Sequence, residues 1–259
     1  MLNRDLSIIL LGRVLQVLIA LVAVRVLTTF LSPEEVGNYY IILALLAFFN
    51  LVLLNPPGMY FGRHLLQWQR SKNLLNALFV FVLWIVIVAI VAIPVSMSAY
   101  YWLGYEAKFD LDLFLIYIFI TIIISTIHRN VMYGANTLGY RKEFVIYLIS
   151  TLLIGLVFSA SIVYFYYEFA LGWLMGIILA EALMLYLIFK FFIQKNRLDI
   201  NKIKLTLSKD KLNKILSFTL PVCVTTFLFW GQTTAYRFIV DYQYSAEVLG
   251  YLAVGLAIS

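Results

Sequence analysis

Seven apolar runs, each long enough to cross a lipid bilayer, constrain this chain more than any other feature of its sequence. An eighth run begins near residue 246, and the seven complete ones cover approximately residues 7–31, 36–56, 74–98, 111–138, 143–166, 170–193 and 215–240. The hydrocarbon core of a membrane is about 30 Å thick, and a helix needs roughly 20 residues to span it. Membrane-spanning strands would instead show alternating segments of about ten residues. The sequence therefore predicts an all-α polytopic membrane protein.

The composition agrees with this class and excludes several others. Hydrophobic residues make up 64% of the chain and charged residues only 12%, whereas about a quarter of the residues in a soluble domain are charged. The net charge of +6 would suit nucleic acid, but most of the basic residues lie in the connections between the apolar runs. The single Cys223 permits no internal disulfide and has no companions for a metal or redox site. We expect no nucleic-acid partner, no metal and no cofactor.

The distribution of charges predicts the orientation of the chain. If the N-terminus is cytoplasmic, nearly all Lys and Arg residues of the connections fall inside, and Lys108 alone falls outside. The acids Glu34, Glu35, Glu106 and Asp241 then lie on the outer side. Because short cytoplasmic connections carry an excess of basic residues, this pattern predicts a cytoplasmic N-terminus.

The basic segment at residues 195–213 is the only sizeable linker between the runs. Two interpretations are open: it contacts anionic lipids or a partner, or it is a solvated inner loop that orients its neighbours. In either case it divides the chain into a six-helix unit, residues 1–194, and the beginning of a second unit, residues 214–259.

One turn occurs twice in the chain. Leu31–Tyr40 reads L-S-P-E-E-V-G-N-Y-Y, and Tyr244–Ala253 reads Y-S-A-E-V-L-G-Y-L-A, so that a serine, an acid and a glycine recur in register. Ser32 is placed to cap the helix that follows, and Glu35 stands three residues later, as in a capping box. Internal repetition is common in transporters that hold a site between two helix bundles. Coincidence is the alternative, because the shared pattern is short.

Four arginines lie inside apolar runs, where charge is expensive. Glu181 is the only acid that matches them, and the four are Arg13, Arg25, Arg129 and Arg237. A charge near the bilayer centre costs about 2.5 kcal/mol or more, so such side chains usually face a bundle interior or an aqueous cavity. Arg237 lies near the outer end of its run, four residues before Asp241, which predicts a local ion pair.

The predicted cationic cavity combines residues of two runs. Within residues 111–138, polar residues follow one another at spacings of four, four and three, which places them on one helix face. Gln16 shares a face with Arg13, while Arg25 either lines the cavity or reaches the outer surface. A polar contact between helices is the alternative for the stripe. The candidate substrate-binding residues are Arg13, Gln16, Arg25, Ser125, Arg129, Tyr133 and Asn136.

Two further residues are candidates for ion coupling. Glu181 has apolar neighbours on its own helix face, so it is either a coupling site for protons or sodium or a neutral acid hydrogen-bonded to a neighbour. His128 precedes Arg129 but points about 100 degrees away from the stripe, and a proton carrier is one role open to it. In addition, the N-P-P-G at Asn55–Gly58 is expected to kink or end the second helix, because consecutive prolines remove backbone donors.

Four segments resemble a known family of transporters. They are L-S-P-E-E-V-G-N-Y-Y, N-P-P-G-M-Y-F-G-R-H-L-L-Q-W, L-P-V-C-V-T-T-F-L-F-W and Y-R-F-I-V-D-Y-Q-Y-S-A-E-V-L-G-Y. The chain resembles the oligosaccharide flippases of the MOP superfamily, the Wzx type, although Tyr236 stands where members usually have an acid. The resemblance implies about twelve helices, so the chain would be an N-terminal fragment holding one six-helix lobe and the first helix and a half of a second.

The same resemblance implies a function. Such a protein flips a polyprenyl-pyrophosphate-linked oligosaccharide across the bacterial cytoplasmic membrane, by alternating access, for O-antigen of lipopolysaccharide or a capsule-like polysaccharide. Its implied partners are the lipid-linked oligosaccharide, membrane lipids and other polysaccharide-assembly proteins.

Two other functions are alternatives to this one. A membrane enzyme of glycan assembly, such as a polymerase or phosphatase, would need catalytic groups in an extracytoplasmic loop, and the longest such loop, residues 99–110, has no His or Arg. A cation-coupled drug exporter of the same superfamily would favour acids over arginines within its helices. No phosphate-binding loop for nucleotide hydrolysis is present. We therefore expect a transporter and not an enzyme.

Overall fold

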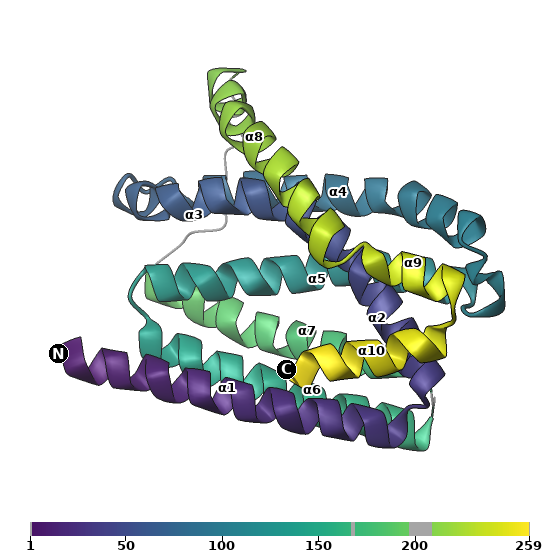
Figure 1. The fold of residues 1–259 in the computed structure, drawn as a ribbon. Helices are drawn as coiled ribbons and strands as arrows, with labels where there is room; N and C mark the ends of the chain where they lie inside the picture. Colours follow the sequence, from purple (N-terminus) through teal and green to yellow (C-terminus); the bar gives the residue numbers. More distant parts are fainter. Residues whose placement is uncertain (1, 167–168, 197–208, 259) are drawn as a thin grey trace.

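The computed structural model describes residues 2–166, 169–196 and 209–258, and Figure 1 shows them as a bundle of long helices. The described residues contain no β-strand, and seven of their helical segments are long and apolar enough to cross a membrane. The prediction of an all-α polytopic membrane protein is confirmed. The elements are α1 (Leu2–Phe30), α2 (Pro33–Phe48), the π-helix η1 (Phe49–Leu54), α3 (Asn55–Arg70), α4 (Leu74–Trp102), the 3₁₀-helix η2 (Tyr105–Ala107), α5 (Leu111–Thr137), α6 (Arg141–Phe165), α7 (Ala170–Asn196), α8 (Lys209–Thr233), α9 (Tyr236–Gln243) and α10 (Ala246–Ile258).

The second and seventh spans differ most in length from the apolar runs that predicted them. The second continues from Pro33 to Arg70, and the seventh extends from Leu212 to Gln243 through a turn between α8 and α9. Most of the basic linker, residues 197–208, lies outside the described residues, so both interpretations of that segment stay predictions.

The N-P-P-G motif bends the second span without ending it. The π-helix η1 precedes Pro56 and Pro57, and α2 and α3 run in different directions on either side of it (Figure 1). Because Pro57 has no N–H, it cannot bond the carbonyl of Leu53. The indole Nε1 of Trp84 donates to that carbonyl instead, at 2.9 Å. A side chain of α4 therefore stabilises the bend, and of the two predictions for this motif the kink is the one that the structure shows.

The main core lies between α2, η1, α4, α5 and α7. Phe49, Phe114, Ile118 and Leu174 are almost completely buried there. On the other side of the bundle, α6 and α7 pack so closely that a Cβ atom on Gly176 would overlap with the backbone of Ser159. Small residues allow this approach, which is a common way for membrane helices to associate.

The two copies of the repeated turn have the same local structure. The hydroxyl of Ser32 accepts a hydrogen bond from the Glu35 amide at 3.3 Å, and that of Ser245 accepts one from the Val248 amide at 3.2 Å. The predicted cap at Ser32 is thus confirmed. In a capping box the Glu35 carboxylate would accept a hydrogen bond from the backbone amide of Ser32. It accepts one instead from the amide of Ala170, at the start of α7, at 2.7 Å. It joins two helices because the helix dipole favours an acid at each N-terminus.

The two turns also contact each other. Helices α2 and α10 cross at their glycines, where a Cβ atom on Gly37 would overlap with the carbonyl of Ala246 and one on Gly250 with the carbonyl of Pro33. Only a residue without a side chain allows backbones to approach in this way. The glycine that recurs in the sequence is therefore the contact point between the first helices of the two copies.

Candidate functional site

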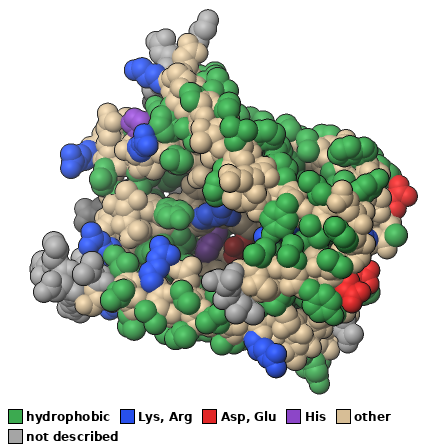
Figure 2. All heavy atoms as spheres, viewed as in Figure 1, with side chains coloured by type: hydrophobic (Ala, Val, Ile, Leu, Met, Phe, Trp, Pro, Cys, Tyr) green, Lys and Arg blue, Asp and Glu red, His purple; other side chains and the backbone are tan. Residues whose placement is uncertain are grey.

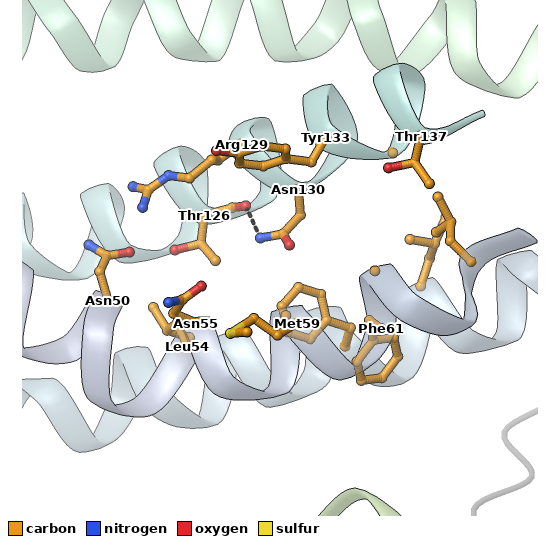
Figure 3. Close-up of a pocket in the computed structure, with 16 residues that line it drawn as sticks. Asn50, Leu54, Asn55, Met59, Phe61, Thr126, Arg129, Asn130, Tyr133 and Thr137 are labelled. Carbon is orange, nitrogen blue, oxygen red and sulfur yellow. Dashed lines mark hydrogen bonds between the residues drawn. The ribbon is translucent and has the colours of Figure 1, made fainter. Parts of the chain in front are cut away.

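A cavity of about 300 Å³ lies between η1, α3, α4 and α5. One wall is largely apolar, with Leu54, Met59, Phe61 and Phe81. Figure 3 shows polar side chains of α5 facing those of η1 and α3 across it. A mostly apolar cavity with a few convergent polar groups is the usual form of a binding site for a small molecule or a part of one. Its polar residues are Asn50, Asn55, Thr126, Arg129, Asn130, Tyr133 and Thr137.

Arg129 supplies the charge of this cavity. Its side chain is exposed, and it forms no hydrogen bond or ion pair with another residue that the structure describes. In Figure 3 its guanidinium extends toward the end of the cavity where Asn50 and Asn55 lie. An arginine in the middle of a membrane-spanning helix is costly unless a counter-charge or water is available to it. This guanidinium therefore has five N–H donors available to a ligand.

The polar stripe predicted on the fourth span divides between two environments. Arg129 and Tyr133 line the cavity, as the cavity-lining interpretation requires. Ser125 is buried and donates a hydrogen bond to the carboxylate of Glu181 on α7, as the helix-contact interpretation requires. Asn136 is not among the lining residues. The four residues point in different directions because a helix has 3.6 residues per turn. Each step of four residues therefore turns the side chain about 40 degrees further around the helix.

Several lining residues were not predicted. Thr126, Asn130 and Thr137 form a second stripe on α5 beside the first, and the Asn130 amide donates to the carbonyl of Thr126 at 2.7 Å (Figure 3). The signal was present as polar residues in an apolar run. Asn50 and Asn55 come from the bend in the second span, and their position depends on the π-helix, which the sequence pattern did not indicate.

Gly58 explains why the bend and α5 lie close together. A Cβ atom at this position would be 3.3 Å from the side-chain oxygen of Asn130 and 3.5 Å from the Phe81 ring. The last residue of N-P-P-G therefore lets α3 approach α5 closely at the cavity. The motif contributes both the bend that positions Asn55 and the small residue that the cavity wall needs.

Glu181 and His128 lie in contacts between helices. The Glu181 carboxylate accepts the bond from Ser125, and no ion pair joins it to Arg129 among the described residues. His128 is buried, with its Nε2 atom 3.3 Å from the hydroxyl of Thr151 on α6. The geometry thus agrees with a Glu181 that is hydrogen-bonded to a neighbouring helix, and ion coupling at either residue stays a prediction.

The residues predicted on the first span lie elsewhere. Arg13 and Gln16 share a face, as predicted, and the guanidinium donates to the Gln16 side-chain oxygen at 3.0 Å. The side chains of Arg13 and Arg25 are exposed, and neither they nor Gln16 line the Arg129 cavity. Helix α1 packs against α6, where a Cβ on Gly12 would meet the side chain of Val145. The structure therefore does not bring the first-span and fourth-span arginines together in one cavity.

The ion pair predicted between Arg237 and Asp241 is wrong. Asp241 pairs with Lys108, with its two oxygens 2.6 and 2.8 Å from the ammonium nitrogen. The Arg237 guanidinium lies over the ring of Tyr40, 5.0 Å from its centroid. The turn between α8 and α9 directs Arg237 toward α2 and Asp241 toward the loop before α5, so the spacing of four residues did not decide the pairing.

These observations define a polytopic helical membrane protein whose bundle holds a mostly apolar cavity with a few polar groups. Figure 2 shows a face of the molecule that is hollowed near its centre, where basic, histidine and acidic side chains gather among apolar ones. Residues 26–259 match the model of a family described as polysaccharide biosynthesis protein, and the chain belongs to this family. No curated protein and no solved structure matched the chain.

Proposed function

We propose that this protein is a Wzx-type flippase of the MOP superfamily, which carries a polyprenyl-pyrophosphate-linked oligosaccharide across the bacterial cytoplasmic membrane. The observation that carries the proposal is the free guanidinium of Arg129 in a cavity within a membrane-spanning helix bundle. Membership of the polysaccharide biosynthesis family supports the class of substrate. The product would be a surface polysaccharide such as O-antigen.

The chemistry of the cavity suits a pyrophosphate. Arginine keeps its charge in any membrane environment, and its planar fork donates two parallel hydrogen bonds to phosphate oxygens. Asn50 and Asn55 add neutral amides on the opposite wall, which can donate to the same oxygens or accept from sugar hydroxyls. The apolar wall of the cavity would accommodate the first isoprene units of the carrier lipid. One charged group and several amides thus match a ligand that has an anionic, a polar and an apolar part.

Transport would follow from movement of two helix bundles against each other. In this proposal, residues 1–194 form the first bundle and residues 214–259 begin a second one, and the site opens alternately to the two sides of the membrane. The N-terminus is cytoplasmic, and protons or sodium bound at Glu181, or protons at His128, drive the cycle. The protein is proposed to transport its substrate without changing it chemically.

The proposal is tested by replacing Arg129. In a flippase-deficient bacterial strain, Arg129→Ala is expected to abolish surface-glycan export while membrane abundance stays near the native level, because no hydrogen bond or ion pair to another described residue is lost with the side chain. Arg129→Lys should retain part of the export, since the charge remains but the two-pronged geometry is lost. Surface glycan and membrane abundance are measured on the same cells.

Asn136→Ala is the matched control, because Asn136 lies on the same helix and does not line the cavity. It should export normally. Normal export by a well-expressed Arg129→Ala variant would remove Arg129 from the substrate site and contradict the proposal. A loss of abundance in both Arg129 variants would show a structural role instead.

A further inference from the structure

The bend of the second span carries two of the amides that line the Arg129 cavity. Asn50 lies within the π-helix η1, Asn55 directly follows it, and the backbone N–H of Asn55 donates to the carbonyl of Asn50, five residues earlier. This hydrogen bond spans one residue more than an α-helical one, and one residue corresponds to about 100 degrees of rotation. The residues after η1 are therefore rotated about the axis of α3, relative to a continuous α-helix, and Asn55 lies opposite α5 across the cavity (Figure 3).

Pro57 and Trp84 together explain why the chain keeps this π-helix. In an α-helix the N–H of residue 57 would donate to the carbonyl of Leu53, but a proline has no N–H. The indole Nε1 of Trp84 on α4 donates to that carbonyl at 2.9 Å, and the Trp84 ring is half-buried against the main core. A membrane offers few other donors to a free carbonyl. The α-helical alternative thus lacks its donor at residue 57, while the bent form gains one from α4.

Helix α4 contacts the bend at two successive turns. Phe81 lines the cavity, and a Cβ atom on Gly58 would be 3.5 Å from its ring. Trp84, three residues later, bonds to Leu53 and is not among the residues that line the cavity. One turn of α4 therefore limits how closely α3 approaches, and the next turn limits how far it rotates.

We propose that Trp84 is a positioning residue for the Arg129 cavity: its hydrogen bond to the Leu53 carbonyl holds the rotation of α3 at which Asn55 faces the ligand of Arg129. Asn50, inside the π-helix, is held in the same way. This role rests on the proposed function only for the identity of that ligand, because the contacts that define it lie within the second span and α4. Trp84 would thus influence transport without touching the substrate.

A purely structural role for Trp84 makes a different prediction, because the Leu53 carbonyl can be given another donor. Pro57→Ala restores the backbone N–H that an α-helical turn would use for this carbonyl. In the double variant, Trp84→Phe with Pro57→Ala, the carbonyl regains a partner but α3 loses the rotation set by η1. If only the lost bond matters, the double variant recovers both membrane abundance and export. If the rotation matters, it recovers abundance alone.

The first measurement is surface-glycan export per unit of membrane protein in the flippase-deficient strain. Trp84→Phe keeps an aromatic ring without the donor, and Pro57→Ala permits the α-helical bond. We expect each to lower export about fivefold or more, as for the loss of one or two hydrogen bonds to a ligand. The double variant should be more abundant than Trp84→Phe and export no better. Pro94→Ala should export normally, since this proline inside α4 is exposed and does not line the cavity.

The second measurement detects the rotation of α3 without any ligand. Asn55 is exposed and lines the cavity, so a cysteine at this position should react with a water-soluble thiol reagent, in the purified whole chain with Cys223→Ser. Pro57→Ala should slow that reaction about fivefold or more, because a thiol turned from the polar groups of the cavity into apolar surroundings ionises less readily. Trp84→Phe should slow it as well, and Pro94→Ala should leave it unchanged.

Three results would overturn the inference: native export per unit of protein in Trp84→Phe, full recovery of export in the double variant, or unchanged reactivity of the cysteine in Pro57→Ala. If Trp84→Phe cannot be recovered from membranes, the reactivity in Pro57→Ala decides alone. Failure of the proposed function gives a different result. Arg129→Ala would then export normally, while the reactivity at position 55 would still change with Pro57 and Trp84.

Discussion

The α8–α10 segment meets the rest of the protein in several places, and two of these contacts are built in opposite ways. At the α2–α10 crossing, Gly37 and Gly250 bring two backbones into contact, and Leu249 is completely buried beside them. At the α3–α8 contact, half-buried rings such as Tyr60 and Phe218 meet beside a cavity. The crossing depends on exact shape, whereas aromatic and long side chains can adjust to a change in distance. We therefore expect the crossing to stay together and the α3–α8 contact to open and close.

The largest expected effect comes from filling the crossing. In Gly37→Leu the new side chain would collide with the carbonyl of Ala246, which cannot move without its helix. We expect a loss of about 3 kcal/mol or more in folding stability, at the upper end of the cost of overpacking. Membrane abundance and the denaturation temperature in detergent, followed by size-exclusion chromatography, measure it. Gly255→Leu on α10 is the control, because a Cβ atom at that position would have no neighbouring atom within 4 Å. A wild-type denaturation temperature in Gly37→Leu would show that the crossing is not tight.

An intermediate effect is expected where an ion pair fastens α9 to the loop before α5. The side chain of Asp241 is only 5% exposed and that of Lys108 23% exposed. Asp241→Asn should cost about 2 kcal/mol, less than the roughly 3 to 5 kcal/mol of a fully buried pair, because Lys108 is partly solvated. The coupling energy comes from thermal denaturation of three variants: Lys108→Met alone, Asp241→Leu alone, and the two combined. Strictly additive losses would show that the pair does not link the two parts of the chain.

The smallest effect is expected at the adjustable contact. Phe218→Leu removes the ring beneath the Arg63 guanidinium and beside Tyr60, but the site is half-buried and neighbouring side chains can fill it. We expect a loss of about 0.5 to 1 kcal/mol in thermal stability. A loss as large as that of Gly37→Leu would contradict the contrast between the two contacts and would place the rigid connection at α3–α8 instead.

Contacts between distant parts of the chain could not be predicted from local sequence, whereas contacts within one turn could. Burial, with a smaller contribution from the Asp241 charge, raises the pKa of Tyr105 in the loop before α5, so this phenol stays neutral. Asp241 lies on α9, 133 residues after its partner Lys108 in the chain. No local sequence pattern indicated that these two residues would meet. The caps at Ser32 and Ser245, in contrast, join residues three apart and could be predicted from each turn alone.

The sequence by itself determined the class of this protein, its membrane spans and the residues that must avoid lipid. Length and hydropathy are local properties, so most spans agree with the apolar runs to within a few residues. The second and seventh differ most: Pro57 and Trp84 carry the second through a bend, and the seventh continues through the turn between α8 and α9. Arg129 could be singled out because a charge is costly anywhere in the hydrocarbon core.

Only the tertiary structure decided which of these residues meet. Asn50 and Asn55 face Arg129 because a π-helix turns them, Ser125 leaves the stripe to reach Glu181, and the repeated glycines contact each other because two helices cross there. Each of these outcomes depends on how far a helix is rotated about its axis and where it crosses its neighbour. Those two quantities are set by packing over the whole bundle, and a residue spacing within one helix does not contain them.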